Sequence, residues 1–365
     1  MPAIKWFPFW RHIPANSKFT VLITCGVVVI VVFTLKLFSE LHFAVQRSSA
    51  RGPSCAEIQQ GHDRLMASVE FSGGLGNIMF QYAFLYVTSR AHGYEMVVPS
   101  TKELDILKEA FEIDTSSFEK TDWEKDLTAR CFDVIEDEWD CAYDPKLVEK
   151  SRKNVHYKGY FQSWKYLVTY EDDLRQIFRF RPSILNDAAS VLQKTIASRL
   201  NSLNSTDVRP VLVGIHVRRG DYLDEKEFVD FGYNIADYGY IEKAMAYFRR
   251  KYSNVLFIAC SNDVKWVKAG FGTTADVFIV EGNSAATDMA ILSLTNHTIM
   301  TVGTFGWWIS FLTNGHTVYY KYPFRPGSLL GEQFKGNIDT HIYPNWVGLE
   351  GDNSNLMNIF TVRSP

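Results

Sequence analysis

Beyond Pro210 the sequence alternates between short apolar runs and longer stretches with helical periodicity. The apolar runs predict strands at 211–217, 254–260, 276–280, 297–302 and 317–322. Helices are expected between them at 238–252, 264–270, 286–294 and 305–313. Short strands separated by helices form βαβ units, which build a parallel sheet covered on both faces with right-handed crossovers. This half is therefore predicted to be a doubly wound α/β domain.

A second strand-loop-helix unit is predicted near residue 66. The segment "LMASVEF" is typical of a short buried strand, "SGGLGN" (72–77) of a turn, and the run after it of a helix that Gly93 ends. The stretch from 101 to 160 is less regular and carries the acidic cluster "IEDEWD" (135–140). Two Rossmann-like domains facing a cleft are the economical architecture. The expected boundaries are an N-terminal lobe over 66–209, a C-terminal lobe over 210–345 and a tail over 346–365.

The N-terminal region predicts a membrane anchor. The run "FTVLITCGVVVIVVFTL" (19–35) is uncharged, and 17 residues at ~1.5 Å each span about 26 Å of a helix. A cleaved signal peptide is the alternative, but its apolar region has roughly 7–15 residues and a small-residue cleavage site follows it, which this chain lacks. We expect a cytoplasmic tail over 1–18, a transmembrane helix over 19–38 and a stem over 39–65.

Two glycosylation sequons bear on topology, because they are used only if the large C-terminal part is lumenal. Asn204 lies in a polar stretch and is expected to be exposed. Asn296 lies within an apolar pattern and is expected to be buried and unmodified. Basic residues flank the apolar run on both sides, so the positive-inside rule gives no orientation.

The cysteines suggest an oxidising compartment. Cys131 and Cys141 flank an acidic, loop-like segment and are the favoured disulfide pair among three possible pairings of four cysteines. Cys260 ends an apolar run and is expected as a buried thiol. No two cysteines have CxxC spacing, so a cysteine zinc site is not expected.

Composition excludes several classes of protein. Hydrophobic residues make up 46% and charged residues 22% of the 365 residues, which fits neither a disordered chain nor a protein with many membrane spans. The chain has 38 basic and 41 acidic residues, a net charge of -3 and no long basic run. Nucleic acid is therefore not an expected partner.

The first predicted strand of the C-terminal half ends in charge, as "VGIHVRRGDY" (213–222). In an open parallel sheet, ligands bind beyond the carboxyl ends of the strands. Side chains alternate along a strand, so His216 and Arg218 share one face and Arg219 lies on the other. One arginine could bind phosphate oxygens with its planar fork while the other pairs with Asp221. A network that only ties the strand to its loop is the alternative.

Other polar or glycine-rich segments lie at predicted strand ends, each with a structural alternative. "SGGLGN" carries Gly74 and Gly76, which could admit a ligand to a helix N-terminus or simply form a turn; Met79 breaks the dinucleotide fingerprint. Asp263 could accept hydrogen bonds from a purine or cap a helix. Thr304 and the amides near it open a helix where an anion would be favoured.

Two residues are candidates for contact with an acceptor sugar. Trp307 could stack on a sugar ring, although its helical spacing with Phe311 also suits a core position. Asp288 lies near the start of an apolar helix, where its carboxylate could also interact with the helix dipole.

Four segments in this order resemble the alpha-1,2-fucosyltransferases: "GGLGN…MFQYA", "GYFQSWKY", "HVRRGDY" and "SND…W…DMAILSLTNHTIMTVGTFGWW". The resemblance extends from about residue 68 to 322. It implies a GT-B-like fold and an inverting, metal-independent enzyme that uses GDP-fucose and needs no cofactor. It also implies a type II Golgi membrane protein with a lumenal catalytic part. Such an enzyme moves L-fucose to the 2-hydroxyl of a terminal galactose on a glycoprotein or glycolipid; a homodimer is left open.

The resemblance also implies roles for individual residues. Arg218 would contact the donor diphosphate, His216 belongs to the same motif, and Arg219 is left to pair with Asp221. The remaining donor contacts would be Asp263 near guanine, Thr304 with Phe305 and Gly306 near the phosphates, and Gly74, Gly76 and Asn77 in the donor cleft. Ile78 departs from the glutamine that many relatives have at this position. The catalytic base is unsettled: Asp221 and Asp288 are candidates, as is departure assisted by arginine with little help from a base.

Two other functions are considered. A metal-dependent GT-A glycosyltransferase would hold a cation on D-x-D carboxylates, which "VIEDEWD" imitates only loosely. A membrane-anchored carbohydrate-binding protein without catalytic activity is the other, and the complete His216, Arg218, Asp221 and Thr304 set argues against it.

Overall fold

The computed structural model describes residues 63–99, 101–113, 131–202 and 209–352, with Thr34, residues 36–38 and Cys55. The elements below belong to one compact unit that begins at His62. Among the described residues, no helix is both long and apolar enough to cross a membrane. The tail over 1–18, most of the anchor over 19–38 and most of the stem over 39–65 lie outside the described residues, so these remain predictions.

A small parallel sheet forms the N-terminal part of this unit, in the order β2-β1-β4-β3. β1 is Met66–Val69, β2 Glu95–Val97, β3 Asp133–Glu136 and β4 Val155–Lys158. The long helix α3 (Leu75–His92) follows β1 and ends at Gly93, which adopts the left-handed conformation with φ 71°. The prediction of strand, glycine turn and glycine-terminated helix is confirmed, whereas β3 and β4 were not predicted.

A larger parallel sheet forms the C-terminal part, in the order β10-β9-β8-β5-β6-β7. All five predicted strands are present. Their observed bounds are β5 Val211–Val217, β6 Val255–Ser261, β7 Val277–Ile279, β8 His297–Met300 and β9 Thr317–Tyr320. A further strand, β10 (Val347–Leu349), pairs with β9, so the expected tail over 346–365 is wrong at its start. The doubly wound α/β half is confirmed.

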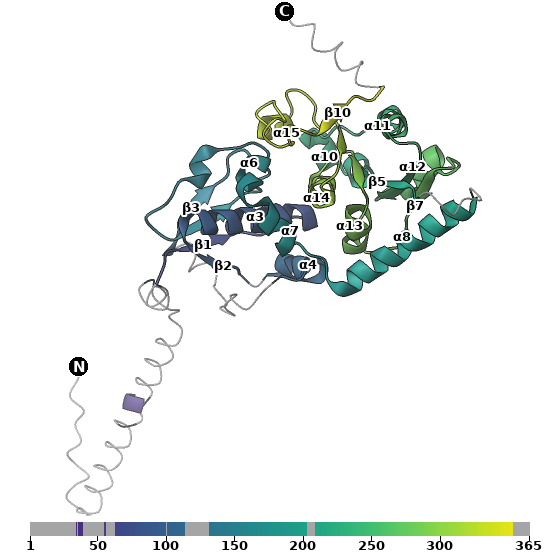
Figure 1. Ribbon diagram of the computed structural model, residues 1–365. Helices are drawn as coiled ribbons and strands as arrows, with labels where there is room; N and C mark the ends of the chain where they lie inside the picture. The colour runs from purple at the N-terminus through teal and green to yellow at the C-terminus, as the bar shows by residue number, and fades with distance from the viewer. Residues whose placement is uncertain are drawn as a thin grey trace, which may run out of the picture. The chain divides into compact units, whose positions relative to one another are not determined.

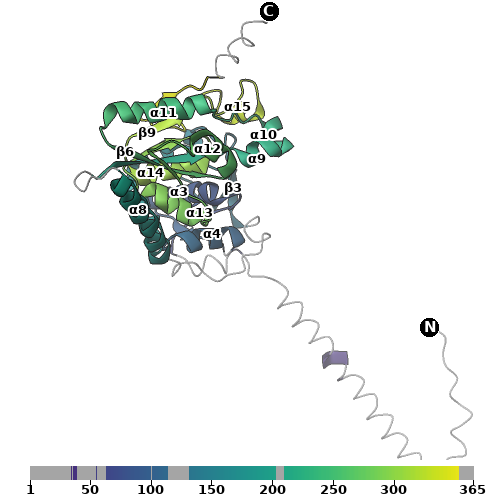
Figure 2. The same cartoon turned by 90° about the vertical axis from the view of Figure 1, so that its right-hand side faces the viewer.

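Helices cover both faces of the large sheet (Figures 1 and 2). α11 and α12 pack on the face that presents Val213, Ile215 and Val217, while α8, α13 and α14 pack on the opposite face. The helices of this part are α9 Gly220–Asp224, α10 Lys226–Phe231, α11 Tyr238–Lys251, α12 Val264–Phe271, α13 Ala285–Ser293, α14 Thr304–Thr313 and α15 Leu329–Gln333. Before them come α4 Lys102–Ala110, α6 Trp164–Leu167, α7 Glu171–Ile177 and α8 Pro182–Ser202, with short 3-10 turns at Pro145–Val148 and Val168–Tyr170.

One hydrophobic core runs from the small sheet into the large one. It joins α3 to α13 and α14, and both Trp307 and Trp308 are completely buried in it. At the crossing of α3 and α14, the Trp308 indole N–H donates to the Gly76 carbonyl at 2.9 Å. The two sheets are therefore joined by a continuous apolar interior and by direct hydrogen bonds.

Candidate active site

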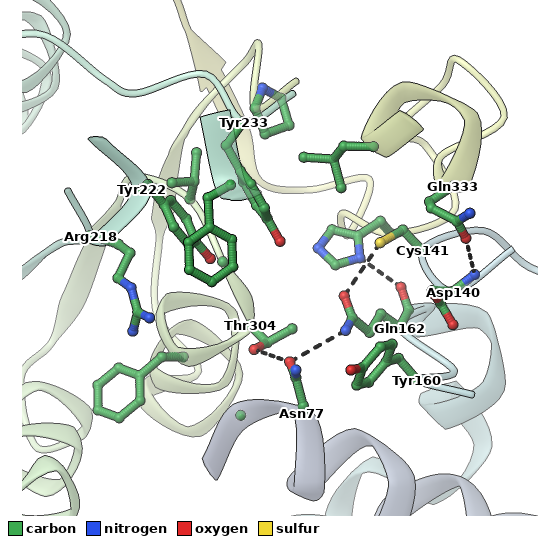
Figure 3. A pocket seen from close by; sticks show the side chains of 18 of the residues that line it. Asn77, Asp140, Cys141, Tyr160, Gln162, Arg218, Tyr222, Tyr233, Thr304 and Gln333 are labelled. Carbon is green, nitrogen blue, oxygen red and sulfur yellow. Dashed lines mark hydrogen bonds between the residues drawn. The ribbon is translucent and has the colours of Figure 1, made fainter. Parts of the chain in front are cut away.

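A cavity of about 750 Å³ lies where the carboxyl ends of the two sheets meet (Figure 3). Its walls come from loops that follow β1, β3 and β4 of the small sheet and β5 and β8 of the large one. The polar groups that line it include Asn77, Asp140, Tyr160, Gln162, His216, Arg218, Thr301 and Thr304. A second cavity, of about 640 Å³, adjoins it and shares Tyr222, Tyr233, Tyr319 and Tyr320.

The cavity lies at the topological switch point of the large sheet. β5 and β8 are neighbours, and the chain continues from β5 to β6 on one side but from β8 to β9 on the other. Such a point leaves a crevice at the carboxyl ends of the strands. The segments that follow β5 and β8 are joined there by a hydrogen bond from the Arg218 backbone N–H to the Thr301 hydroxyl at 2.9 Å. The charged strand end therefore faces the place where a ligand of this fold class binds.

Arg218 reaches the cavity with its guanidinium held in a fixed orientation. Its Nε donates to Asp221 at 2.9 Å and its Nη2 donates to the second carboxylate oxygen. Asp221 also accepts from the Asn262 side-chain amide at 2.7 Å. A fork that is held on one edge keeps its remaining N–H groups available for an anion such as a phosphate.

Arg219 does not line the cavity. It forms an ion pair with Asp263 at 3.6 Å and lies over the Trp266 ring at 4.5 Å. The expected Arg219–Asp221 pair is therefore wrong, and Asp221 belongs to Arg218. The physical reason is that β5 ends at Val217, so side chains no longer alternate at residues 218 and 219.

His216 lies beneath the cavity as a neutral side chain. It is 6% exposed and contacts Phe305 in a tilted arrangement, with ring centroids 5.0 Å apart. Burial, together with the nearby charge of Arg218, lowers the pKa of His216 to about 3. Gly306 makes room for the ring, because a Cβ at that position would lie 2.7 Å from His216 Nδ1. Gly306 does not line the cavity, so its expected place near the phosphates is corrected to this packing role.

The glycine loop joins the two halves of the site. A Cβ on Gly76 would lie 2.7 Å from the Thr304 carbonyl carbon and from the Phe305 nitrogen, so only glycine allows α3 to approach α14 this closely. Next to it, Asn77 Oδ1 accepts from the Thr304 hydroxyl at 2.7 Å and from Gln162 Nε2 at 3.4 Å. Gly74, Gly76, Asn77, Thr304 and Phe305 all line the cavity, so the structure brings these predicted donor residues together with Arg218.

Comparison with known proteins assigns the chain to a family, because the sequence profile of glycosyl transferase family 11 matches residues 28–350. The chain belongs to glycosyl transferase family 11. This family 11 glycosyltransferase is 30% identical over 301 residues to Galactoside alpha-(1,2)-fucosyltransferase 2 of Rattus norvegicus, covering 81% of this chain and 80% of the relative. It is 29% identical to Galactoside 2-alpha-L-fucosyltransferase Sec1 of Mus musculus, over 79% of this chain and 74% of the relative.

Among solved structures, the family 11 chain is similar to fucosyltransferase NodZ from Bradyrhizobium, with a TM-score of 0.43 and 16% identity. That match covers 68% of this chain and 93% of the other. An Arabidopsis thaliana FUT1 mutant in complex with GDP gives a TM-score of 0.46 and 13% identity, over 80% of this chain and 82% of the other.

Besides Asp221 and Gly306, three more predicted site residues of the family 11 enzyme do not line the cavity. Asp263 caps α12 by accepting the Trp266 backbone N–H at 3.1 Å, which was its structural alternative. Asp288 accepts from Asn283 at 3.1 Å in the first turn of α13. Trp307 is completely buried and donates to the His341 carbonyl at 2.8 Å. Trp307 is thus a core residue and the expected acceptor contact is wrong.

The structure also corrects two of the predictions about the cysteines and the glycosylation sequons. Cys131 is disulfide-bonded, but Cys141 is a buried free thiol that donates to Gln162 Oε1 at 3.4 Å. The expected Cys131–Cys141 disulfide is therefore wrong, whereas the buried free thiol of Cys260 is confirmed. Asn296 is exposed, contrary to expectation, and its side-chain oxygen accepts the Leu212 N–H at 2.9 Å. Asn204 lies outside the described residues.

Sequence reasoning missed the wall that the small sheet contributes. Asp140, Tyr160 and Gln162 line the cavity from loops that follow β3 and β4. The segment "GYFQSWKY" contributed only to the family resemblance, because the strand before it was not predicted. Placing β4 before this segment would have put its polar side chains at a strand end beside the glycine loop.

Proposed function

We propose that this chain is a galactoside alpha-1,2-fucosyltransferase that transfers L-fucose from GDP-beta-L-fucose to the 2-hydroxyl of a terminal galactose. The observation that carries the proposal is the guanidinium of Arg218, which Asp221 orients toward a cavity at the switch point of the large sheet. Membership of glycosyl transferase family 11 and the names of the curated relatives supply the sugar and the linkage.

The cavity suits displacement of a nucleoside diphosphate. Negative charge grows on the leaving phosphate as its bond to the sugar breaks, and a cation fixed beforehand at that place stabilises the transition state. Arg218 is that cation. The N-terminal turn of α14, which begins at Thr304, presents backbone N–H groups to the same cavity and favours an anion. The acceptor hydroxyl attacks the opposite side of the anomeric carbon, which inverts the β-linked donor to an α-fucoside.

The reaction is proposed to need no metal ion and no other cofactor. The acidic segment "IEDEWD" resembles a cation-binding motif only in composition. Within it, the Asp137 carboxylate accepts the backbone N–H groups of Trp139 and Phe161, at 3.2 and 3.0 Å. Arg218 already supplies the positive charge that a cation would provide in a GT-A enzyme.

The cellular setting is proposed from the sequence. A helix over 19–38 would anchor the protein as a single-pass type II Golgi membrane protein with its GT-B-like catalytic part in the lumen. The acceptor is then a galactose-terminated glycan on a glycoprotein or glycolipid, and a homodimer is a compatible assembly. The exposed position of Asn296 on the folded surface agrees with a lumenal face that carries glycans.

The test is a transfer assay on the full chain with labelled GDP-fucose and a panel of galactosides, followed by linkage analysis of the product. We expect an alpha-1,2-fucoside and unchanged activity in excess EDTA. Specific binding of GDP-fucose without transfer to any galactoside would make the protein a carbohydrate-binding protein instead. Loss of activity in EDTA that Mn²⁺ restores would support the metal-dependent mechanism.

Arg218→Ala tests the residue that carries the proposal. Removing one group that stabilises charge in the transition state lowers kcat by about 10²–10³-fold, and Arg218→Lys should restore little because lysine lacks the fork. The matched control is Arg249→Ala. Arg249 forms the same forked pair with Asp276, at 2.8 and 2.7 Å, but does not line the cavity. Equal kcat for the two folded variants would refute the role of Arg218.

A further inference from the structure

The wall of the cavity that faces Arg218 carries a carboxylate with no assigned role. Arg218 and Asp140 lie on opposite sides of the cavity (Figure 3). In a displacement with inversion, the leaving phosphate, the sugar carbon and the attacking hydroxyl lie in line. The group that stabilises the leaving phosphate and the group that takes the hydroxyl proton therefore belong on opposite walls.

The two carboxylates that the sequence suggested as bases do not fit this geometry. Asp221 accepts hydrogen bonds from both Nε and Nη2 of Arg218 and also from Asn262. It therefore orients the guanidinium that stabilises the leaving phosphate. Asp288 does not line the cavity and is bonded to Asn283. Neither carboxylate is placed to receive a proton from an acceptor opposite Arg218.

Among the described residues, three carboxylates line the cavity: Asp140, Glu227 and Asp230. Glu227 and Asp230 are both on the exposed surface of α10, and Asp230 is ion-paired with Lys226. Water surrounds an exposed carboxylate at the rim of the cavity. This water competes for the proton and weakens the interaction of the carboxylate with one particular hydroxyl. Asp140 is half-buried and comes from the loop after β3, deeper in the small-sheet wall.

Asp140 is held in place before any substrate binds. Its backbone N–H donates to Gln333 Oε1 at 3.0 Å, and its carbonyl accepts the Gln162 N–H at 2.8 Å. The Tyr160 backbone N–H donates to its carboxylate. The neighbouring Asp137 fixes the same two loops to each other by accepting the Phe161 N–H at 3.0 Å. The carboxylate therefore has a defined position, as a group that acts on one hydroxyl requires.

The surroundings of Asp140 strengthen it as a base. Burial raises the pKa of Asp140 above its ordinary value, and the hydrogen bond from Tyr160 offsets part of that rise. Asp140 interacts with Asp137 and Cys141 of the same loop and with the Tyr160 backbone. The Lys335 ammonium lies over the ring of the preceding residue, Trp139, at 4.9 Å. The two histidines that line the cavity are buried and neutral, because burial lowers the pKa of His216 to about 3 and that of His341 to about 4.

We propose that Asp140 is the general base that removes the proton from the acceptor hydroxyl, an inference that rests on the proposed fucosyl transfer. The hydroxyl oxygen forms its bond to the anomeric carbon of fucose while its O–H bond breaks and the proton passes to the Asp140 carboxylate. The bond from the anomeric carbon to the phosphate oxygen breaks, and its electron pair leaves with GDP toward Arg218. The products are the fucoside, GDP and a protonated Asp140, which returns its proton to water.

The test is Asp140→Asn in the full chain, with GDP affinity, kcat and the pH profile of kcat measured on one acceptor that the wild type fucosylates. Loss of a general base lowers kcat by about 10²–10⁴-fold. GDP affinity should stay at the wild-type value, because the carboxylate faces the acceptor. Wild-type kcat should fall toward acid as the base is protonated, and this fall should be missing from the residual activity of the variant. Asp140→Glu should recover part of kcat.

The matched control is Glu138→Gln, which removes one exposed carboxylate from the same loop and should keep wild-type kcat. If folded Asp140→Asn keeps its kcat, or retains the fall in kcat toward acid, Asp140 is not the base. Loss of GDP affinity together with kcat would also overturn the proposal, in favour of a role in donor binding or folding. Since the acceptor is one that the wild type fucosylates, each of these results leaves the proposed function standing; a wild type inactive on every acceptor would remove that function instead.

Discussion

Gly76→Ala should damage the protein although it adds only one methyl group. The new Cβ would lie 2.7 Å from Thr304 Oγ1, from the Thr304 carbonyl carbon and from the Phe305 nitrogen. Two of these three atoms are backbone, so no side-chain rotation relieves the contact, and α3 and α14 must move apart. Overpacking of this kind costs about 1–3 kcal/mol. In a protein of this size, each kcal/mol lowers Tm by roughly 2–4 °C.

The same movement should reach the substrate. Separation of the two helices stretches the Asn77–Thr304 hydrogen bond and the Trp308–Gly76 hydrogen bond, which are 2.7 and 2.9 Å long. Thr304 and Phe305 line the cavity, so KM for GDP-fucose should rise along with the fall in Tm.

The assay is thermal unfolding and donor kinetics of the full chain, with Gly74→Ser as the control for stability. Gly74 is the N-cap of α3 with φ -85°, nothing lies within 4 Å of its added Cβ, and serine is a favoured cap. Gly74→Ser should therefore melt no lower than the wild type. The reasoning is refuted if Gly76→Ala keeps both the wild-type Tm and the wild-type KM.

Two further predictions concern residues around the site. Asp263→Ala removes the cap of α12 and should lower the free energy of unfolding by about 0.5–2 kcal/mol, yet leave GDP affinity unchanged in a titration; a weakened affinity would restore the guanine-binding role expected from the resemblance. Between pH 7 and 5 the protein should lose stability, because burial holds the pKa of His341 at about 4 while its unfolded form gains a proton below about 6.5. The stability that neutral His341 contributes is present above the unfolded pKa and is lost as pH falls. His341→Gln should therefore reduce the loss of stability with pH by up to about 1.4 kcal/mol per pH unit. Burial raises the pKa of Asp137 to about 7, which has the opposite effect on stability because the buried carboxylate is disfavoured as pH rises. Thermal melts of the wild type and of His341→Gln at pH 7 and pH 5 separate the two effects. The same loss of stability in both proteins would contradict the role of His341.

The large sheet was predictable because its strands are buried on both faces. Such strands appear in sequence as continuous apolar runs, and the predicted range 211–217 coincides with β5. The small sheet gave a weaker signal. Its edge strand β3 has three exposed residues of four, so no apolar run marks it. Without β3 and β4, the loops that carry Asp140 and Gln162 could not be assigned to the site.

The errors in the site have local and long-range causes. Alternation along a strand cannot assign partners to Arg218 and Arg219, because the strand stops before both of them. The disulfide prediction used separation in sequence, but Cys141 packs with Leu330 and Phe334, which lie nearly two hundred positions away. Strand-end position did identify Arg218, Thr304 and the glycine loop, since that rule depends on topology and not on individual contacts.

The hydrophobic core that the two sheets share determines how the unit unfolds and whether one sheet can fold without the other. Trp308 contacts Phe80 of α3 with ring centroids 5.0 Å apart and shares its burial with the helices of both sheets. A fragment with only the large sheet would expose Trp307, Trp308 and Phe311 to water, a contiguous apolar surface of the kind that drives aggregation. The two sheets should therefore melt in one calorimetric transition, and neither should survive limited proteolysis that removes the other.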